Sequence, residues 1–167
     1  MKSLLRCSRR WKRISRELQV IYDTNILLYI LRSSQASDSL ARILKLQYVE
    51  ESISLVTLAE IRSLAIQFGW GSRRIDRMEE MISSLAILDI NVPEIIDRYV
   101  EIDVYSKGKH SIEVSDFSSI KMGKNDLWIA ATASVYQAKL LTMDLDFQHL
   151  APKFLDVLYV SPSIFNN

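Results

Sequence analysis

Short runs of apolar residues alternate along this chain with longer segments whose apolar residues recur at helical spacing. The short runs predict β-strands at residues 20–22, 53–56, 87–90, 140–142 and 157–160. The longer segments predict helices at residues 24–31, 37–49, 57–68, 72–85, 93–105 and 125–137, with a helical turn at 147–150 and an irregular stretch at 106–124. Because strands separated by helices form βαβ units, we expect an α/β fold with a mainly parallel sheet.

Four acidic residues stand where a predicted strand gives way to a turn or helix: Asp23, Glu60, Asp126 and Asp144. In an open parallel sheet the carboxyl ends of the strands line one crevice, and ligands bind there. Carboxylates gathered in that crevice repel one another unless a positive charge lies among them. A hard divalent cation prefers oxygen ligands, so the pattern predicts a metal site at this edge of the sheet.

Each acid also has a purely structural interpretation. Asp23 is suited to an Asx-turn after its strand, and Thr57–Glu60 has the pattern of a capping box, in which the glutamate reaches back to the N-cap amide. Asp126 is favoured at the positive end of a helix, an effect worth about 0.3–1 kcal/mol. Asp144 and Asp146 are suited to capping the turn that follows them. The metal-site hypothesis therefore depends on all four acids meeting at one edge.

The positive charge of the chain is concentrated at its beginning. Residues 1–19 carry seven basic side chains and one acidic, which leaves 14 basic and 19 acidic side chains, a net charge of −5, on the rest. We expect a basic N-terminal extension at residues 1–18 and one domain at 19–167. The extension suits a nucleic-acid-binding arm, a transit peptide or a translated upstream stretch outside the domain.

Cysteine content and hydropathy indicate the cellular compartment in which the protein is expected. The chain has a single cysteine, Cys7, which excludes an intramolecular disulfide and fits a reducing environment. No apolar run approaches the roughly 20 residues needed to span a bilayer. We expect a cytoplasmic protein that does not enter a membrane.

Four segments together resemble a known family. They are Ile21–Leu27 with its Asp-Thr-Asn, Thr57–Glu60, Asn125–Ala131 and Leu141–Phe147. In this order and spacing they resemble the PIN-domain ribonucleases, and most closely the toxin subunits of VapBC-type toxin–antitoxin pairs. The resemblance runs from about residue 19 to the C-terminus and leaves the basic extension outside.

The resemblance implies a three-layer α/β/α sandwich, usually dimeric, with an acidic site for Mg²⁺ or Mn²⁺. It assigns direct metal ligation to Asp23 and Asp126, and completion of the acidic cluster to Glu60 and Asp144. Four further residues would support the site by hydrogen bonding, packing or capping: Asp146, Thr24, Asn25 and Thr142. No departure from the family pattern removes an acid.

The activity implied is metal-dependent hydrolysis of RNA to a 5′-phosphate and a 3′-hydroxyl. Divalent metal reverses the negative field of the acids, binds a phosphate oxygen and lowers the pKa of bound water. We expect single-stranded or loop RNA as substrate, with Lys121 and Lys124 as the best candidates to contact its backbone. A toxin would also have a cognate antitoxin as partner.

Other functions remain open from the sequence. The chain also fits a PIN nuclease that is not a toxin, or a non-catalytic module whose acidic pocket receives a basic peptide. The Asp144-Leu-Asp146 motif resembles that of haloacid-dehalogenase-like phosphatases. However, Phe147 and Gln148 follow the motif where that family has a small residue and then Thr or Val, and the motif lies late in the chain instead of on an early strand.

Overall fold

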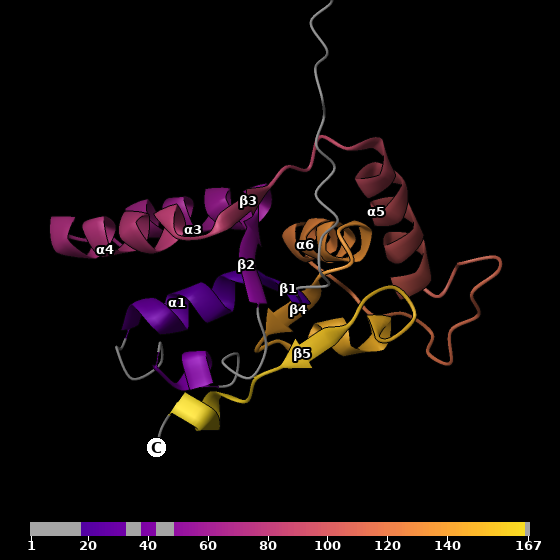
Figure 1. Cartoon of the computed structure of the whole chain (residues 1–167). Coiled ribbons are helices and arrows are strands. Elements are labelled where there is room, and N and C mark those ends of the chain that lie inside the picture. Colours follow the sequence, from indigo (N-terminus) through magenta and orange to yellow (C-terminus); the bar gives the residue numbers. More distant parts are fainter. Residues whose placement is uncertain (1–17, 33–37, 43–48, 166–167) are drawn as a thin grey trace, which may run out of the picture.

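The protein is built on a five-stranded parallel sheet (Figure 1). The computed structural model describes residues 18–32, 38–42 and 49–165. The strands are β1 (Leu18–Tyr22), β2 (Val49–Ser54), β3 (Ala86–Leu88), β4 (Lys139–Thr142) and β5 (Val157–Tyr159). Their order is β3-β2-β1-β4-β5, and every neighbouring pair is parallel. The central position of β1 places the residue after it, Asp23, at the middle of the sheet edge.

Helices cover both faces of the sheet, which confirms the predicted α/β/α layering (Figure 1). One face carries α1 (Thr24–Arg32), α3 (Leu55–Gln67) and α4 (Ser72–Ser83). The other carries α5 (Pro93–Ser106), α6 (Lys124–Val135) and the 3₁₀ helix η1 (Leu145–Leu150). A second 3₁₀ helix, η2 (Pro162–Phe165), follows β5.

Strand β1 is buried on both sides, as expected of the central strand of a parallel sheet. Val20 and Tyr22 pack into the core with α1, α3 and α4, while Ile21 points into the core with α5 and α6. All three side chains are at most 2% exposed. This packing fixes the register of β1, because a shift by one residue would exchange its two faces.

The second strand begins and ends earlier than the sequence predicts. The sequence predicts a strand at residues 53–56 and a helix starting at Thr57, but β2 ends at Ser54 and α3 starts at Leu55. The Ser54 hydroxyl accepts hydrogen bonds from the amides of Val56 and Thr57 and so caps α3. The charged residues Glu50 and Glu51 interrupt the apolar pattern by which a strand is predicted. The sheet accommodates their side chains because this part of β2 pairs only with β1.

Other boundaries differ less. The expected helix at 37–49 is helical at residues 38–42, residues 43–48 lie outside the described residues, and residue 49 belongs to β2. The third strand spans Ala86–Leu88 instead of 87–90. The expected irregular stretch lies between α5 and α6, and α3 ends before Gly69, whose φ of +58° favours glycine. The basic extension falls almost entirely on residues 1–17, outside the described residues.

None of the helices in the described ranges combines the length and the apolar character that crossing a membrane requires.

Candidate active site

Asp23 and Asp144 lie at the carboxyl ends of two neighbouring parallel strands. Asp23 directly follows β1 and begins the turn into α1, and Asp144 lies two residues after β4. The amide of Asp23 continues the ladder by donating to the Leu141 carbonyl oxygen at 3.0 Å. The sheet topology therefore brings these two acids to the same edge.

The Asp23 carboxylate is buried and held by three donors. Only 5% of the residue is exposed. Its Oδ1 accepts from the amide of Thr24 at 2.7 Å. Its Oδ2 accepts from Asn25 Nδ2 and from the hydroxyl of Thr142, each at 2.7 Å. Three of the four residues that the sequence marks as supporting, all except Asp146, thus contact Asp23 at the end of β1 and orient its carboxylate.

The same polar side chains fix the turn that carries Asp144. The Asp144 amide donates to the Thr142 hydroxyl at 3.0 Å, and the Met143 amide donates to Asn25 Oδ1 at 3.1 Å. The Asp144 carboxylate in turn caps η1 by accepting from the Asp146 amide at 2.8 Å. The expected capping by Asp144 is therefore present, and it fixes this carboxyl group beside β1.

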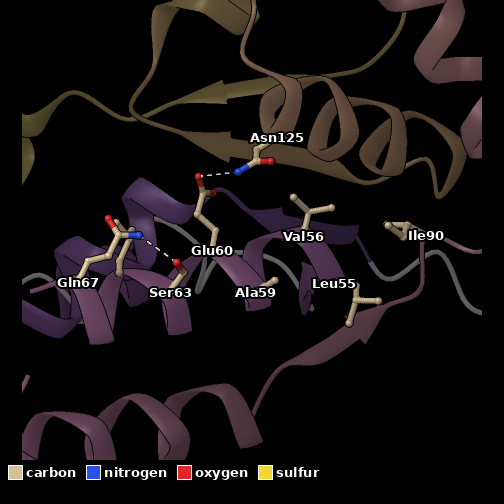
Figure 2. Close-up of a pocket in the computed structure, with 9 residues that line it drawn as sticks. Leu55, Val56, Ala59, Glu60, Ser63, Gln67, Ile90 and Asn125 are labelled. Atoms are coloured by element: carbon tan, nitrogen blue, oxygen red, sulfur yellow. Dashed lines mark hydrogen bonds between the residues drawn. The ribbon is translucent and has the colours of Figure 1, made fainter.

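Glu60 does not form the capping box that its sequence context suggests. Ser54, not Thr57, caps α3, and Glu60 lies in the second turn of that helix. Its Oε2 accepts from the Thr24 hydroxyl, and its Oε1 accepts from Asn125 Nδ2 at 3.0 Å (Figure 2). Glu60 therefore links α3 to the starts of both α1 and α6, which removes the structural interpretation that rivalled a role in the site.

Asn125 is a site residue for which the sequence alone indicates no role. It lies in the first turn of α6, and its amide is the donor to Glu60. The signal in the sequence was its place directly before Asp126, inside a motif already quoted for the family. Its partner on α3 is 65 residues away along the chain, so local patterns could not show the contact.

Asp126 lies in the first turn of α6, half-buried, and its Oδ2 accepts from the Gly123 amide at 3.2 Å. Asp126 therefore lies at the positive end of α6, where the sequence predicts a favourable position for it. Gly123 also leaves room for the carboxylate, because a Cβ at this position would stand 2.6 Å from Asp126 Oδ2.

Two carboxyl groups of the cluster, those of Asp23 and Asp126, have a raised pKa. Burial is the main cause that raises the pKa of Asp23 to about 6; the charges of Asp126 and Glu60 act in the same direction, and the hydrogen bonds from Thr142 and Thr24 oppose it. Burial is also the main cause of the raised pKa of Asp126. Asp144, Glu60 and Asp146 add to it, while the Gly123 amide lowers it. The cluster is therefore a concentrated negative field without a positive side chain inside it among the described residues.

The donor set fits a hard divalent cation in its chemistry, since it consists of anionic carboxylate oxygens around one buried aspartate. Each carboxylate also accepts local hydrogen bonds, and in the described ranges no three His, Cys, Asp or Glu side chains are grouped so as to hold an ion. Mg²⁺ commonly takes one or two protein carboxylates and keeps several waters, so its binding does not require three converging ligands.

The remaining predicted residues lie at the rim. Asp146 is exposed in η1 and acts on the cluster through its charge. Lys121 and Lys124 are exposed, and Lys124 is the first residue of α6, two residues before Asp126. Neither lysine pairs with a carboxylate in the part of the chain that the structure describes.

A hollow of about 540 Å³ opens beside Glu60 and Asn125. Figure 2 shows it along α3, with the Glu60–Asn125 hydrogen bond at one side and apolar residues such as Leu55, Val56 and Ile90 at another. One acid of the cluster, Glu60, thus borders an open and largely apolar depression.

Comparison with known proteins places this chain in a family. The PIN domain model matches residues 20–153, which include all four acids. No curated protein matches the chain. Solved structures with the same fold include VapBC2 from Rickettsia felis bound to a promoter DNA fragment, with 21% identity and a TM-score of 0.67 over 85% of this chain and 98% of that one.

Two further toxin–antitoxin structures are similar to the chain. VapBC-1 from nontypeable Haemophilus influenzae is 23% identical with a TM-score of 0.62, and DNA-bound VapBC from Salmonella typhimurium is 18% identical with a TM-score of 0.61. Each alignment covers 85% of this chain and 98% of the other. At these identities the likeness establishes the fold, and the match to the family model over most of the sequence shows that the chain belongs to the PIN-domain family.

Proposed function

We propose that this protein is a Mg²⁺- or Mn²⁺-dependent endoribonuclease and the toxin component of a toxin–antitoxin pair. The observation that supports the nuclease most strongly is the meeting of Asp23, Glu60, Asp126 and Asp144 at one sheet edge of a PIN domain. Their mutual repulsion favours binding of a divalent cation. A phosphodiester is itself anionic, so this acidic edge would repel it without such an ion.

The side chains have separate roles in this proposal. Asp23 and Asp126 would hold the ion, and Glu60 and Asp144 would complete the negative cluster around it. When bound, the ion supplies a Lewis acid for a phosphate oxygen and lowers the pKa of a water molecule. Thr24, Asn25 and Thr142 keep the carboxylates of Asp23 and Glu60 in fixed positions through the hydrogen bonds described above.

The toxin assignment rests on the structural neighbours. Those compared above are VapBC complexes, in which a toxin is solved together with its antitoxin. By analogy we propose an antitoxin partner, a homodimer of this chain and a cytoplasmic location. The acidic balance of residues 20–167 suits a partner that carries basic side chains.

Cleavage of a labelled RNA pool in Mg²⁺, Mn²⁺ and EDTA tests the nuclease function. We expect cleavage with either metal, none in EDTA, and recovery when excess Mn²⁺ is restored. The products should carry 5′-phosphate and 3′-hydroxyl ends, which end-labelling with kinase before and after phosphatase treatment reveals.

Three other outcomes separate the alternatives. RNA cleavage that continues in EDTA would contradict a metal-dependent site. Turnover of small phosphate esters through a phosphorylated Asp144, with no RNA cleavage, would indicate a phosphatase. Absence of any hydrolysis, together with tight binding of a basic peptide, would indicate a binding module.

A further inference from the structure

A second hollow, of about 310 Å³, opens beside the acidic cluster along α1. It is lined by one face of that helix, where Asn25, Leu28, Tyr29 and Arg32 recur at intervals of three and four residues. Met143 and Asp144, from the turn after β4, complete the lining. We call this hollow the α1 furrow. It begins inside the proposed active site, because Asn25 donates to the Asp23 carboxylate.

The chemical character of the α1 furrow changes along its length. Asn25 and Arg32 are seven residues apart, or about 10 Å along a helix. The end at Asn25 and Asp144 is polar and acidic, and Leu28 and Tyr29 are half-buried between the two ends. At the far end Arg32 is exposed, with its guanidinium carbon 5.8 Å from the centroid of the Tyr29 ring. Arg32 forms no ion pair with any carboxylate of the described ranges.

We propose that the α1 furrow binds the nucleotide next to the scissile phosphate, with the base against the Tyr29 ring and the neighbouring phosphate at Arg32. The proposal rests on the ribonuclease function proposed above and states where the substrate lies. Single-stranded nucleic acids bind proteins through base stacking on aromatic rings and through basic side chains that follow the backbone. The α1 furrow has both, within one nucleotide-sized hollow that opens onto the carboxylates.

The charge distribution favours RNA over a peptide in the α1 furrow. Outside residues 1–19 the chain carries a net charge of −5, so a polyanion needs local positive charge near the cluster. Arg32 provides it at the end farthest from the acids. A basic peptide would be attracted by Asp144 but repelled by Arg32, whereas RNA can place a phosphate at Arg32 and its scissile phosphate at the cluster.

Steady-state cleavage of a labelled single-stranded RNA by the full chain in Mn²⁺ tests the α1 furrow. Arg32→Ala should raise KM about tenfold and leave kcat within about twofold, because it removes a contact made before and during reaction. The slope of log KM against log salt should fall by about 0.7, the value for one phosphate contact on a single strand. Arg32→Lys should recover most of the affinity.

Tyr29 has its own pair of variants. Tyr29→Leu should raise KM by a similar factor, whereas Tyr29→Phe keeps the ring and should retain wild-type KM. The matched control is Arg98→Ala, which also removes one positive charge but lies on α5, across the sheet, where Arg98 pairs with Glu101 at 3.3 Å. Its KM and salt dependence should equal those of wild type.

The results distinguish the α1 furrow from the nuclease itself. If wild type cleaves RNA and Arg32→Ala behaves like Arg98→Ala, the furrow is not a substrate site, although the ribonuclease assignment stands. If wild type neither binds nor cleaves RNA, both proposals fail. If Arg32→Ala leaves the KM for RNA unchanged but alters the affinity for an oligo-arginine peptide, the furrow is a peptide site and the proposal is overturned.

Discussion

Asp126→Asn should reduce RNA cleavage at least about 100-fold while the protein remains folded. Asparagine keeps the size of the side chain and an oxygen that can accept from the Gly123 amide. It removes the negative charge that the proposed site requires. Changing only a hydrogen-bonding partner of a metal ligand typically lowers metal affinity or activity roughly 10- to 100-fold. Loss of a ligand itself should lower the activity at least as much.

The measurement is the initial rate of RNA cleavage in Mn²⁺, with a thermal melt of each protein. The melting temperature of Asp126→Asn should equal or exceed that of wild type, because the substitution removes repulsion from Asp144, Glu60 and Asp146. The control is Asp97→Asn, an exposed aspartate on α5. Wild-type rates in both variants would show that the acidic cluster does not carry the activity.

Gly123→Ala should lower the cleavage rate about 10-fold or more, although it adds only a methyl group outside the cluster. The added Cβ would stand 2.6 Å from Asp126 Oδ2, so the carboxylate must move. Displacement of a catalytic group by about 1 Å can cost roughly 100-fold in rate. The backbone itself tolerates alanine, because Gly123 has a φ of −66°.

Gly71→Ala is the matched control for Gly123→Ala. Gly71 also occupies the N-cap of a helix, α4, with a similar φ of −72°, but a Cβ there would meet no atom within 4 Å. Both variants carry the same cost of alanine at an N-cap, so similar melting temperatures are expected. An undiminished rate in Gly123→Ala would mean that the position of the Asp126 carboxylate does not limit catalysis.

The fold could be predicted because its signals are local and strong. The strands at residues 20–22 and 140–142 are short apolar runs followed by acids, and the sheet pairs them side by side. Alternation of strands with helices then restricts the topology to parallel connections. A parallel sheet with such connections carries helices on both faces, which gives the three-layer arrangement. In it Ile21 faces one layer of helices, and its neighbours Val20 and Tyr22 face the other.

The part of the site that the sequence could not settle depends on contacts between distant segments. Thr57–Glu60 matches a capping box, and the motif alone cannot show that Ser54 caps the helix three residues earlier. The partners of Glu60 are Thr24 and Asn125, 36 and 65 residues away, and only the packing of α1, α3 and α6 brings them together. The start of β2 is not evident from the sequence, because the polar residues Glu50, Glu51 and Ser52 follow Val49.

The carboxylates of Asp23, Glu60, Asp126 and Asp144 are expected to form a divalent-metal site. Its most direct test is anomalous diffraction from crystals of the wild-type protein soaked in Mn²⁺ at millimolar concentration. We expect an anomalous peak in direct contact with the carboxylate of Asp23 or Asp126, and we expect that peak to be lost in Asp126→Asn crystals. Absence of a peak in the cluster, with Mn²⁺ bound only elsewhere or not at all, would contradict this expectation.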